Sequence, residues 1–522
     1  MNIKALLEQK SRIHGAKAAL IHREQKISFE EMLKQTLQLT RAFQFRGIGA
    51  QDHIAVYLPN CPEYILAYFA TFCMGATIVP LDFMLTETEL IKFIQHSHAS
   101  ILFTRTKRDI NLEVIKRECP SIRNIICCDP QAEGVRGVPD LVPYRDLMET
   151  GQNHDRETEY QSADPAAIFY TSGSTGRPKG VLLTYAHLNN PVACIRHFLN
   201  PSMDDSYLCA GIPFSHLGGL DYILFMLSFG STMILMERFQ PLETLRYIER
   251  YRPTIFCIVP SMFVALLSMK EVENFNLTSL RHLVVFGAPS SPVLLKRFHQ
   301  LCPNARLSNG WGMTETAAPN TYSPENPSKI NSIGPFGIGM EAKLVDDKGQ
   351  TVPEGQQGEL WVRGQAVMAG YYQDDELTRQ TLTSDGWLKT GDIARKDEDG
   401  NFYLTGRKKE MIKVAGEIVM APEVEDILHQ HPDIAEAAVI GSPDALRGEV
   451  PRAYVVLREG RTLGVADLRD FIKQHLAHFK IPASIDVLDA LPKNRVGKVD
   501  KEALKQMFSE TTGIPERKGN QV

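Results

Sequence analysis

The sequence predicts an α/β protein whose large N-terminal part holds two α/β subdomains and a small β subdomain, followed by a small α+β C-terminal domain. Three observations support this prediction. Short apolar strands alternate with helical segments as far as Cys302, which is typical of parallel sheets covered by helices. From Ile333 short strands with glycine turns take over, and beyond Gly406 helices and strands alternate again. At 522 residues the chain is also too long for a single hydrophobic core.

The first α/β subdomain begins with capped helices and short buried strands. Ser28 and Glu31 form a predicted capping box at the start of a helix that ends at Gly47. Thr86 and Glu89 repeat this pattern at a later helix. The other elements expected here are strands at 53–58, 77–79 and 99–104 and a helix at 64–74. Their order is that of a βαβ unit, so we expect a parallel sheet.

The second α/β subdomain follows a polar stretch. Residues 129–164 carry few large apolar side chains, and we expect them to form a surface excursion. The alternation of strands and helices then resumes. The expected elements are strands at 207–212, 232–236, 254–259 and 283–286 and helices at 242–251 and 293–302.

The last third of the chain predicts two smaller units. Asp347-Lys348-Gly349 is typical of a hairpin turn between strands at 341–345 and 358–362, which indicates a small β subdomain. Beyond it we expect a separate lid domain. Its elements are strands at 411–414, 437–440 and 453–457 and helices at 422–431 and 466–479.

Composition and charge exclude several classes of function. A net charge of −5 argues against a nucleic-acid binder, so a small molecule is the expected partner. Nine cysteines without a CxxC pair suggest neither a zinc site nor a disulfide framework, and they fit a reduced cytoplasm. The N-terminus lacks the apolar core of a signal peptide, and the longest apolar stretch, 220–236, contains a charge and a glycine. We expect no transmembrane segment, while oligomeric state and contact with a membrane surface stay open.

The segment YTSGSTGRPKG, from Tyr170 to Gly180, predicts a phosphate-binding loop. It follows an apolar strand, and its glycines let backbone N–H groups converge on an anion while hydroxyls and Lys179 add further donors. It lacks the Gly-Lys-Ser/Thr ending of a kinase P-loop. The alternative is a flexible Gly/Ser linker, which the apolar residues on both sides disfavour.

Five motifs in order resemble those of the acyl-adenylate-forming (AMP-binding) superfamily, which includes acyl-CoA synthetases, peptide-synthetase adenylation domains and firefly luciferases. After the loop come PFSHLGG, NGWGMTET, KTGD with GRKKEMIK, and PKNRVGK. The N-terminal region is most similar to free-standing fatty acyl-CoA synthetases of the long-chain-fatty-acid–CoA ligase type. This resemblance implies an AMP-binding domain at 1–405, a hinge at 406–410 and a mobile lid at 411–522.

The resemblance also implies which residues hold ATP. Thr314 would contact the α-phosphate, Glu315 would bind the Mg²⁺ that bridges the phosphates, and Trp311, where a tyrosine is usual, would form a wall of the adenine slot. Asp392 and Arg407 match the residues that hold the ribose hydroxyls. The whole expected set for ATP or AMP is Thr171, Ser172, Gly173, Ser174, Thr175, Gly176, Lys179, Asn309, Gly310, Trp311, Gly312, Asp392 and Arg407.

Lys498, in PKNRVGK, matches the family's adenylation lysine, which bridges the carboxylate and the α-phosphate. A lysine on a mobile lid can withdraw after the first step, so one pocket can serve two reactions. The catalytic set implied is Lys498, Thr314, Glu315 and His216. The residues implied on the hinge and the CoA side are Lys409, Lys413 and Gly416, and those lining the acyl pocket are His216, Phe286, Gly287 and Ala288.

Phe286 stands where most acyl-CoA synthetases carry a small residue, so we expect it either to shorten the acyl tunnel or to turn into the core. The implied activity is an ATP-dependent acid–CoA ligase, acting on a carboxylic, and by resemblance fatty, acid, with ATP, Mg²⁺ and CoA. Transfer to a carrier-protein phosphopantetheine and a luciferase-like oxidation are the alternatives.

Overall fold

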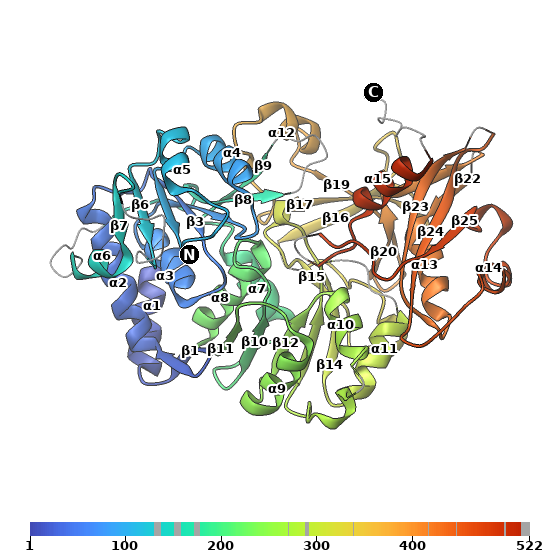
Figure 1. The fold of residues 1–522 in the computed structure, drawn as a ribbon, viewed down its shortest axis with the longest axis horizontal. Helices are drawn as coiled ribbons and strands as arrows, with labels where there is room; N and C mark the ends of the chain where they lie inside the picture. Colours follow the sequence, from blue (N-terminus) through green and yellow to red (C-terminus); the bar gives the residue numbers. More distant parts are fainter. Residues whose placement is uncertain are drawn as a thin grey trace.

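The computed structural model describes residues 1–129, 137–150, 158–171, 178–269, 271–287, 292–337, 339–415, 417–444, 446–494 and 497–512. Within these residues the strands form four sheets, and the α/β class predicted from the sequence is confirmed. Figure 1 shows the N-terminal strands (blue) at one end of the molecule and the C-terminal strands (orange to red) at the other.

The first sheet has the strand order β18-β9-β8-β4-β3-β5-β6-β7. Its centre is the predicted βαβ unit, in which β3 and β4 run parallel. The strands are β3 (His53–Tyr57), β4 (Thr77–Leu81), β5 (Ile101–Thr104), β6 (Asn124–Cys127), β7 (Leu141–Pro143), β8 (Pro165–Thr171), β9 (Lys179–Thr184) and β18 (Gly370–Tyr371). The helices of this region are α2 (Phe29–Phe45), α3 (Pro62–Cys73), α4 (Glu87–Ser97), α5 (Leu112–Glu118) and α6 (Tyr144–Thr150).

The helix caps behave as their sequences predict, with one difference. At Thr86 both halves of the capping box form. At Ser28 the hydroxyl accepts from the Glu31 N–H at 3.1 Å, but the Glu31 carboxylate accepts from Gln35 one turn later. A helical i, i+4 partner therefore replaces the second half of the box.

The expected surface excursion at 129–164 is wrong for part of its length. β7 adds an edge strand to the first sheet, and α6 packs beside α2. Val142 and Leu147 are buried. Two isolated apolar residues give no periodic signal, and this strand depends on pairing with β6 rather than on its own propensity.

The second sheet has the order β15-β14-β13-β12-β10-β11-β1-β2. Its strands are β1 (Ala18–His22), β2 (Gln25–Ser28), β10 (Ser206–Ala210), β11 (Thr232–Met236), β12 (Ile255–Ile258), β13 (His282–Val285), β14 (Arg306–Trp311) and β15 (Thr321–Tyr322). The remaining helices of the large part are α1 (Ile3–His14), α7 (Asn189–Phe198), α8 (Leu217–Phe229), α9 (Pro241–Tyr251), α10 (Pro260–Leu267), α11 (Pro292–Leu301) and α12 (Asp375–Thr381). The sequence analysis missed β1, which pairs in parallel with β11, more than 200 residues later.

Two apolar helices, α3 and α8, are buried on nearly all sides. A helix that is apolar all round belongs in a protein interior or a bilayer. Here α8 ends at Gly230, in the left-handed conformation, and the chain turns into β11, so the apolar stretch 220–236 is a helix followed by a strand. None of the helices in the described ranges has the length and apolarity that crossing a bilayer requires.

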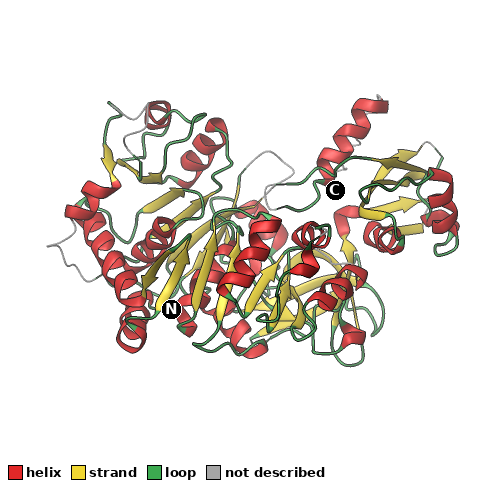
Figure 2. Ribbon diagram, turned by 60° about the horizontal axis from the view of Figure 1, so that its bottom comes forward, coloured by secondary structure: helices red, strands yellow, loops and turns green. Residues whose placement is uncertain are grey.

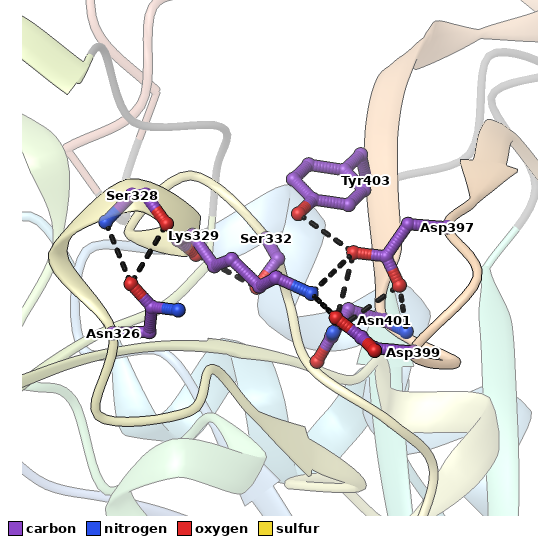
Figure 3. A network of polar contacts seen from close by, with 8 residues as sticks. All are labelled: Asn326, Ser328, Lys329, Ser332, Asp397, Asp399, Asn401 and Tyr403. Atoms are coloured by element: carbon purple, nitrogen blue, oxygen red, sulfur yellow. Dashed lines mark hydrogen bonds and ion pairs between the residues drawn. The ribbon is translucent and has the colours of Figure 1, made fainter.

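The third sheet is the predicted small β subdomain, with the antiparallel order β16-β17-β19-β20. Its strands are β16 (Met340–Val345), β17 (Gly358–Gly364), β19 (Leu388–Lys396) and β20 (Phe402–Arg407). A polar network ties the β19–β20 turn to the segment after β15 (Figure 3). The Lys329 ammonium pairs with Asp397 at 3.0 Å and with Asp399, and Tyr403 donates to Asp397. This network holds the sheet that carries Asp392 and Arg407.

The C-terminal residues form a fourth sheet with a hydrophobic core of their own, between Ile412 and Leu504. The elements are β21 (Met411–Val414), β22 (Glu417–Met420), α13 (Ala421–Gln430), β23 (Ile434–Asp444), β24 (Gly448–Leu457), α14 (Val465–Lys473), β25 (Ser484–Val487) and α15 (Lys501–Thr512). Figure 2 shows this piece beside the large part, outside its sheets. Its contacts with the large part include those of α13 with α11 and β20 and those of β22 with β20.

Candidate active site

A cavity of about 2160 Å³ lies between the large part and the C-terminal residues. Fifteen of the residues singled out from the sequence line it. They are Thr171, Lys179, His216, Phe286, Gly287, Asn309, Gly310, Trp311, Gly312, Thr314, Glu315, Asp392, Arg407, Lys409 and Lys498. Residues up to 327 positions apart in the sequence, Thr171 and Lys498, thus face one space.

The turn after β14 places Glu315 in the cavity wall. The strand ends at Trp311, and a short 3-10 helix at Thr314–Thr316 carries the carboxylate, which is 8% exposed. Its Oε1 accepts a hydrogen bond from the Tyr371 hydroxyl at 3.0 Å. Burial raises the pKa of Glu315, while the hydrogen bond from Tyr371 and the charges of Arg407 and Lys179 oppose the rise. A cation brought next to this carboxylate would therefore favour its charged form.

The residues around Glu315 fit a magnesium ion that reaches the site with ATP. Mg²⁺ is bound in nucleotide sites through one or two carboxylates together with phosphate oxygens and waters. The described residues hold no cluster of three or more acidic, histidine or cysteine side chains that could bind a metal without a nucleotide. One buried carboxylate beside Thr314 matches this donor set, because the phosphates would supply the other ligands.

Asp392 and Arg407 lie next to each other on paired strands, with the Arg407 Nε 2.8 Å from Asp392 Oδ1. The indole N–H of Trp311 donates to Asp392 Oδ2 at 2.8 Å. Asp392 is only 3% exposed. Its contacts with Arg407 and Trp311 fix the orientation of its carboxylate from two sides. From the sequence we expected Trp311 only to form a wall of the adenine slot. Its hydrogen bond to Asp392, the carboxylate expected to bind the ribose, was not predicted.

Lys498 reaches the cavity from the C-terminal residues. The Lys498 backbone N–H donates to the Asn494 side chain at 3.0 Å, which closes the turn that carries the lysine. A Cβ placed on Gly287, at the end of β13, would lie 3.5 Å from Lys498 Cε and 3.9 Å from its Nζ. Burial and the nearby Arg407 guanidinium lower the pKa of Lys498 to about 8, and Asp392 opposes the change. The ammonium is thus held where an anion would stabilise it.

The PFSHLGG segment forms the entrance to α8 and one wall of the cavity. His216 occupies the N-cap position of the helix without a side-chain capping bond, and its Nε2 lies 3.7 Å from Asp82 Oδ2. A Cβ on Gly219 would lie 2.3 Å from the Pro213 carbonyl oxygen, so the tight turn requires glycine there. Gly218 faces the ring of Phe286: a Cβ on it would be 3.5 Å from Phe286 Cε2.

Comparison with known proteins identifies the family. Residues 7–372 match the model of the AMP-binding enzyme family, and residues 423–498 match that of the AMP-binding enzyme C-terminal domain. The chain belongs to the AMP-binding enzymes. Its activity is that of an adenylate-forming acid ligase, and the resemblance to this superfamily noted in the sequence is confirmed.

Similar AMP-binding enzymes act on different acids, as their names state. The chain is 33% identical to 4-coumarate–CoA ligase 2 of Nicotiana tabacum over 90% of this chain and 87% of that protein. It is 30% identical to the long-chain-fatty-acid–CoA ligase of Bacillus subtilis over 95% and 93%. The solved structure of ATP-bound MatB from Rhodopseudomonas palustris superposes with a TM-score of 0.87 at 27% identity, covering 98% and 99% of the two chains.

Some expected site residues of this AMP-binding enzyme lie elsewhere. Lys413 is exposed on β21 and is not among the described residues that line the cavity. Seven expected residues fall outside the described ranges: Ser172, Gly173, Ser174, Thr175, Gly176, Ala288 and Gly416.

Two further residues of this AMP-binding enzyme were not foreseen as site residues. Tyr371 approaches Glu315 only because β18 pairs with β9, a contact that no local pattern signals. Asp221 interrupts the apolar stretch 220–236, and this charge was visible in the sequence. We used it only as an argument against a membrane span.

Proposed function

We propose that this AMP-binding enzyme is an ATP-dependent acid–CoA ligase, with the large domain at 1–405, the hinge at 406–410 and the lid at 411–522. It converts a carboxylic acid and ATP into acyl-AMP and pyrophosphate, and then transfers the acyl group to CoA with release of AMP. The approach of Lys498 to Gly287, beside the Asp392–Arg407 pair, is the observation that supports this proposal most strongly.

The first half-reaction brings together two anions, the carboxylate and the α-phosphate. In our proposal Lys498 lies between them and neutralises both, Lys179 and the loop at 171–176 hold the outer phosphates, and Thr314 contacts the α-phosphate. Mg²⁺ held by Glu315 would neutralise further phosphate charge when ATP binds. Preorganised groups of this kind each contribute roughly 3–4 kcal/mol to lowering the barrier.

The second half-reaction needs the same pocket without the lysine. A thiol attacks the acyl carbonyl, the bond to the phosphate oxygen breaks, and AMP leaves. Rotation of the lid about a hinge at Lys409 would withdraw Lys498 and bring the segment with Lys413 and Gly416 toward the acyl carbonyl. The exposed position of Lys413, away from the cavity, fits a residue that reaches the site only after such a rotation.

We propose that the preferred acid is of medium length, branched or aromatic. The Phe286 ring lies beside Gly218 and lines the cavity, so it occupies space that a long straight chain would need. This supports a pocket that prefers medium-length or aromatic acids to long-chain fatty acids. The relatives named above are a 4-coumarate–CoA ligase and a long-chain-fatty-acid–CoA ligase, so the family itself admits both an aromatic and a long-chain acid.

The proposal is tested by measuring pyrophosphate release with a panel of carboxylic acids, with ATP and Mg²⁺ and with or without CoA. We expect acid-dependent pyrophosphate release in both conditions and acyl-CoA only with CoA, detected by mass spectrometry. A thioester formed on a carrier protein but not on CoA would identify the carrier's phosphopantetheine as the acceptor. Oxygen-dependent light output would indicate a luciferase-like oxidation. Pyrophosphate release that does not depend on any acid would contradict the proposal.

A further inference from the structure

One carboxyl group in the acyl part of the cavity has no role in the chemistry described above. Asp221 lies on α8, among mostly apolar residues, and is 6% exposed. Its Oδ1 is buried without a hydrogen-bond partner among the described residues. Buried polar atoms in folded proteins are nearly always hydrogen-bonded, so an unpaired one calls for a reason.

The position of Asp221 on the helix directs it to the cavity. Gly218, Asp221, Tyr222 and Phe225 all line the cavity, and their spacing of three, four and seven residues places them on one face of α8. Phe286 lies against this face at Gly218. Asp221 therefore lies one turn of α8 after Gly218, the point where Phe286 contacts the helix. This places it on the wall that an acyl group would contact.

The surroundings of Asp221 favour its neutral form. Burial raises its pKa well above the usual range, and no neighbouring cation offsets this within the described part of the chain. A protonated carboxyl both donates and accepts hydrogen bonds. The hydroxyl hydrogens of two nearby tyrosines are already donated elsewhere, since Tyr68 donates to the Phe214 carbonyl at 2.6 Å and Tyr222 to the Leu208 carbonyl at 3.1 Å.

A leucine would fit this apolar helix without the penalty of an unpaired polar group. The penalty disappears when a ligand supplies the missing partner. A hydroxyl group suits a neutral carboxyl best, because each can donate to and accept from the other. An ammonium group would require Asp221 to ionise in apolar surroundings, which is costly.

We propose that Asp221 is a specificity-determining residue that binds a hydroxyl group of the substrate, remote from the reacting carboxylate. The substrate class is then a hydroxylated acid rather than a plain alkyl or phenyl acid. This inference rests on the proposed acid–CoA ligase function, because it concerns the same pocket. Sites built to hydrogen-bond a substrate hydroxyl reject the analogue that lacks it far more strongly than apolar pockets reject an added group.

The test compares matched acids that differ only in the hydroxyl: 4-hydroxycinnamate with cinnamate, 4-hydroxyphenylacetate with phenylacetate, and 8-hydroxyoctanoate with octanoate. The kcat/KM of pyrophosphate release is measured for wild type, Asp221→Asn and Asp221→Leu. We expect wild type to prefer the hydroxylated member of at least one pair by about 10- to 100-fold. Asn keeps a donor and an acceptor and should retain a preference, whereas Leu should abolish it.

Ser228 provides a matched control. It lies on the same helix, and its hydroxyl is also buried without a partner, but it is not among the described residues that line the cavity. Ser228→Ala should leave the preference of each pair unchanged. Thermal unfolding separates the roles further, since Asp221→Leu should raise Tm while it removes the preference, a combination that a purely structural role would not give.

The outcomes separate this inference from the proposed function. If wild type activates acids but shows equal kcat/KM within every pair, the hydroxyl site is refuted and the ligase function stands. The same holds if Asp221→Leu keeps the wild-type preference. If no acid supports pyrophosphate release, the function fails and the specificity assignment falls with it.

Discussion

Replacing Lys498 by alanine should separate the two half-reactions. The ammonium lies beside Gly287 and near the Asp392–Arg407 pair, where the reacting carboxylate and α-phosphate would meet. It would contact both groups during adenylate formation, whereas thioester formation proceeds after the lid has moved. We therefore expect Lys498→Ala to lose adenylation and to keep thioester formation from supplied acyl-AMP.

The size of the loss follows from the environment of the lysine. The usual lysine pKa of 10.5 falls to about 8 in the free protein, which corresponds to roughly 3 kcal/mol of unfavourable interaction at 1.36 kcal/mol per pH unit. When phosphates and a carboxylate bind, the interaction of the Lys498 ammonium with its surroundings becomes favourable, because their negative charge stabilises it. A preorganised cation in such a site accelerates the reaction about a hundred- to a thousandfold, so kcat for adenylation should fall by that factor.

The pH dependence gives a second readout. Lys498 acts as a cation, and its lowered pKa means that the free enzyme loses this charge as the pH rises through about 8. The kcat/KM of wild-type adenylation should therefore fall above that pH, and the fall should be absent from the residual activity of Lys498→Ala. Stopped-flow measurement of pyrophosphate release for the first half-reaction, and CoA-dependent consumption of synthetic acyl-AMP for the second, give both numbers.

A nearby lysine serves as the control. Lys493 belongs to the same segment, and its ammonium pairs with Glu436, so Lys493→Ala changes the charge of the segment without removing Lys498. It should leave the adenylation rate within about threefold of wild type, the scale of a surface ion pair. An equal loss of both half-reactions in Lys498→Ala would refute the idea that the lysine serves only the first.

Three further predictions concern single side chains. Trp311→Phe removes the indole N–H from Asp392, which should raise the KM for ATP about tenfold with little change in kcat; an unchanged KM would show that Arg407 alone orients the carboxylate. Phe286→Gly should raise the palmitate-to-octanoate ratio of kcat/KM at least about tenfold, since the ring no longer fills the pocket, and an unaltered ratio would place the end of the acyl chain elsewhere. Burial and the neighbouring Glu425 raise the pKa of Asp426 to about 7, so the folded protein binds a proton that the unfolded chain releases near pH 4, and stability falls between these values as the pH rises. Asp426→Asn should therefore gain up to roughly 2 kcal/mol of stability over wild type between pH 5 and pH 7 in denaturant titrations, and a pH-independent gain would contradict this assignment.

Local patterns predicted most of the elements that position the site. The strand and helix at 53–74 and the hairpin around Gly349 were visible because apolar spacing and turn residues act within a few positions of the chain. The motif residues Glu315, Asp392 and Lys498 were also identified from the sequence, and the structure brings them to one cavity.

The elements that were missed depend on distant partners. β7 is three residues long and exists because β6 offers it an edge, so no window of sequence around it has a strand pattern. Tyr371 reaches Glu315 through the pairing of two strands from different thirds of the chain. The bond from Trp311 to Asp392 likewise spans 81 positions, and only the assembled sheets bring these two side chains together.

The pairing of β1 with β11 has a consequence for how the chain is made. Leu20 lies opposite Met233, so the hairpin of β1 and β2 cannot join the rest of its sheet until more than 200 further residues have left the ribosome. At about 5–20 residues per second this takes roughly 10–40 seconds. During that time the edge of β1 that later pairs with β11 is unpaired, and nascent-chain binding by a chaperone should be strongest there. Deletion of β1 would leave β11, which also pairs with β10, as a permanently open edge for aggregation.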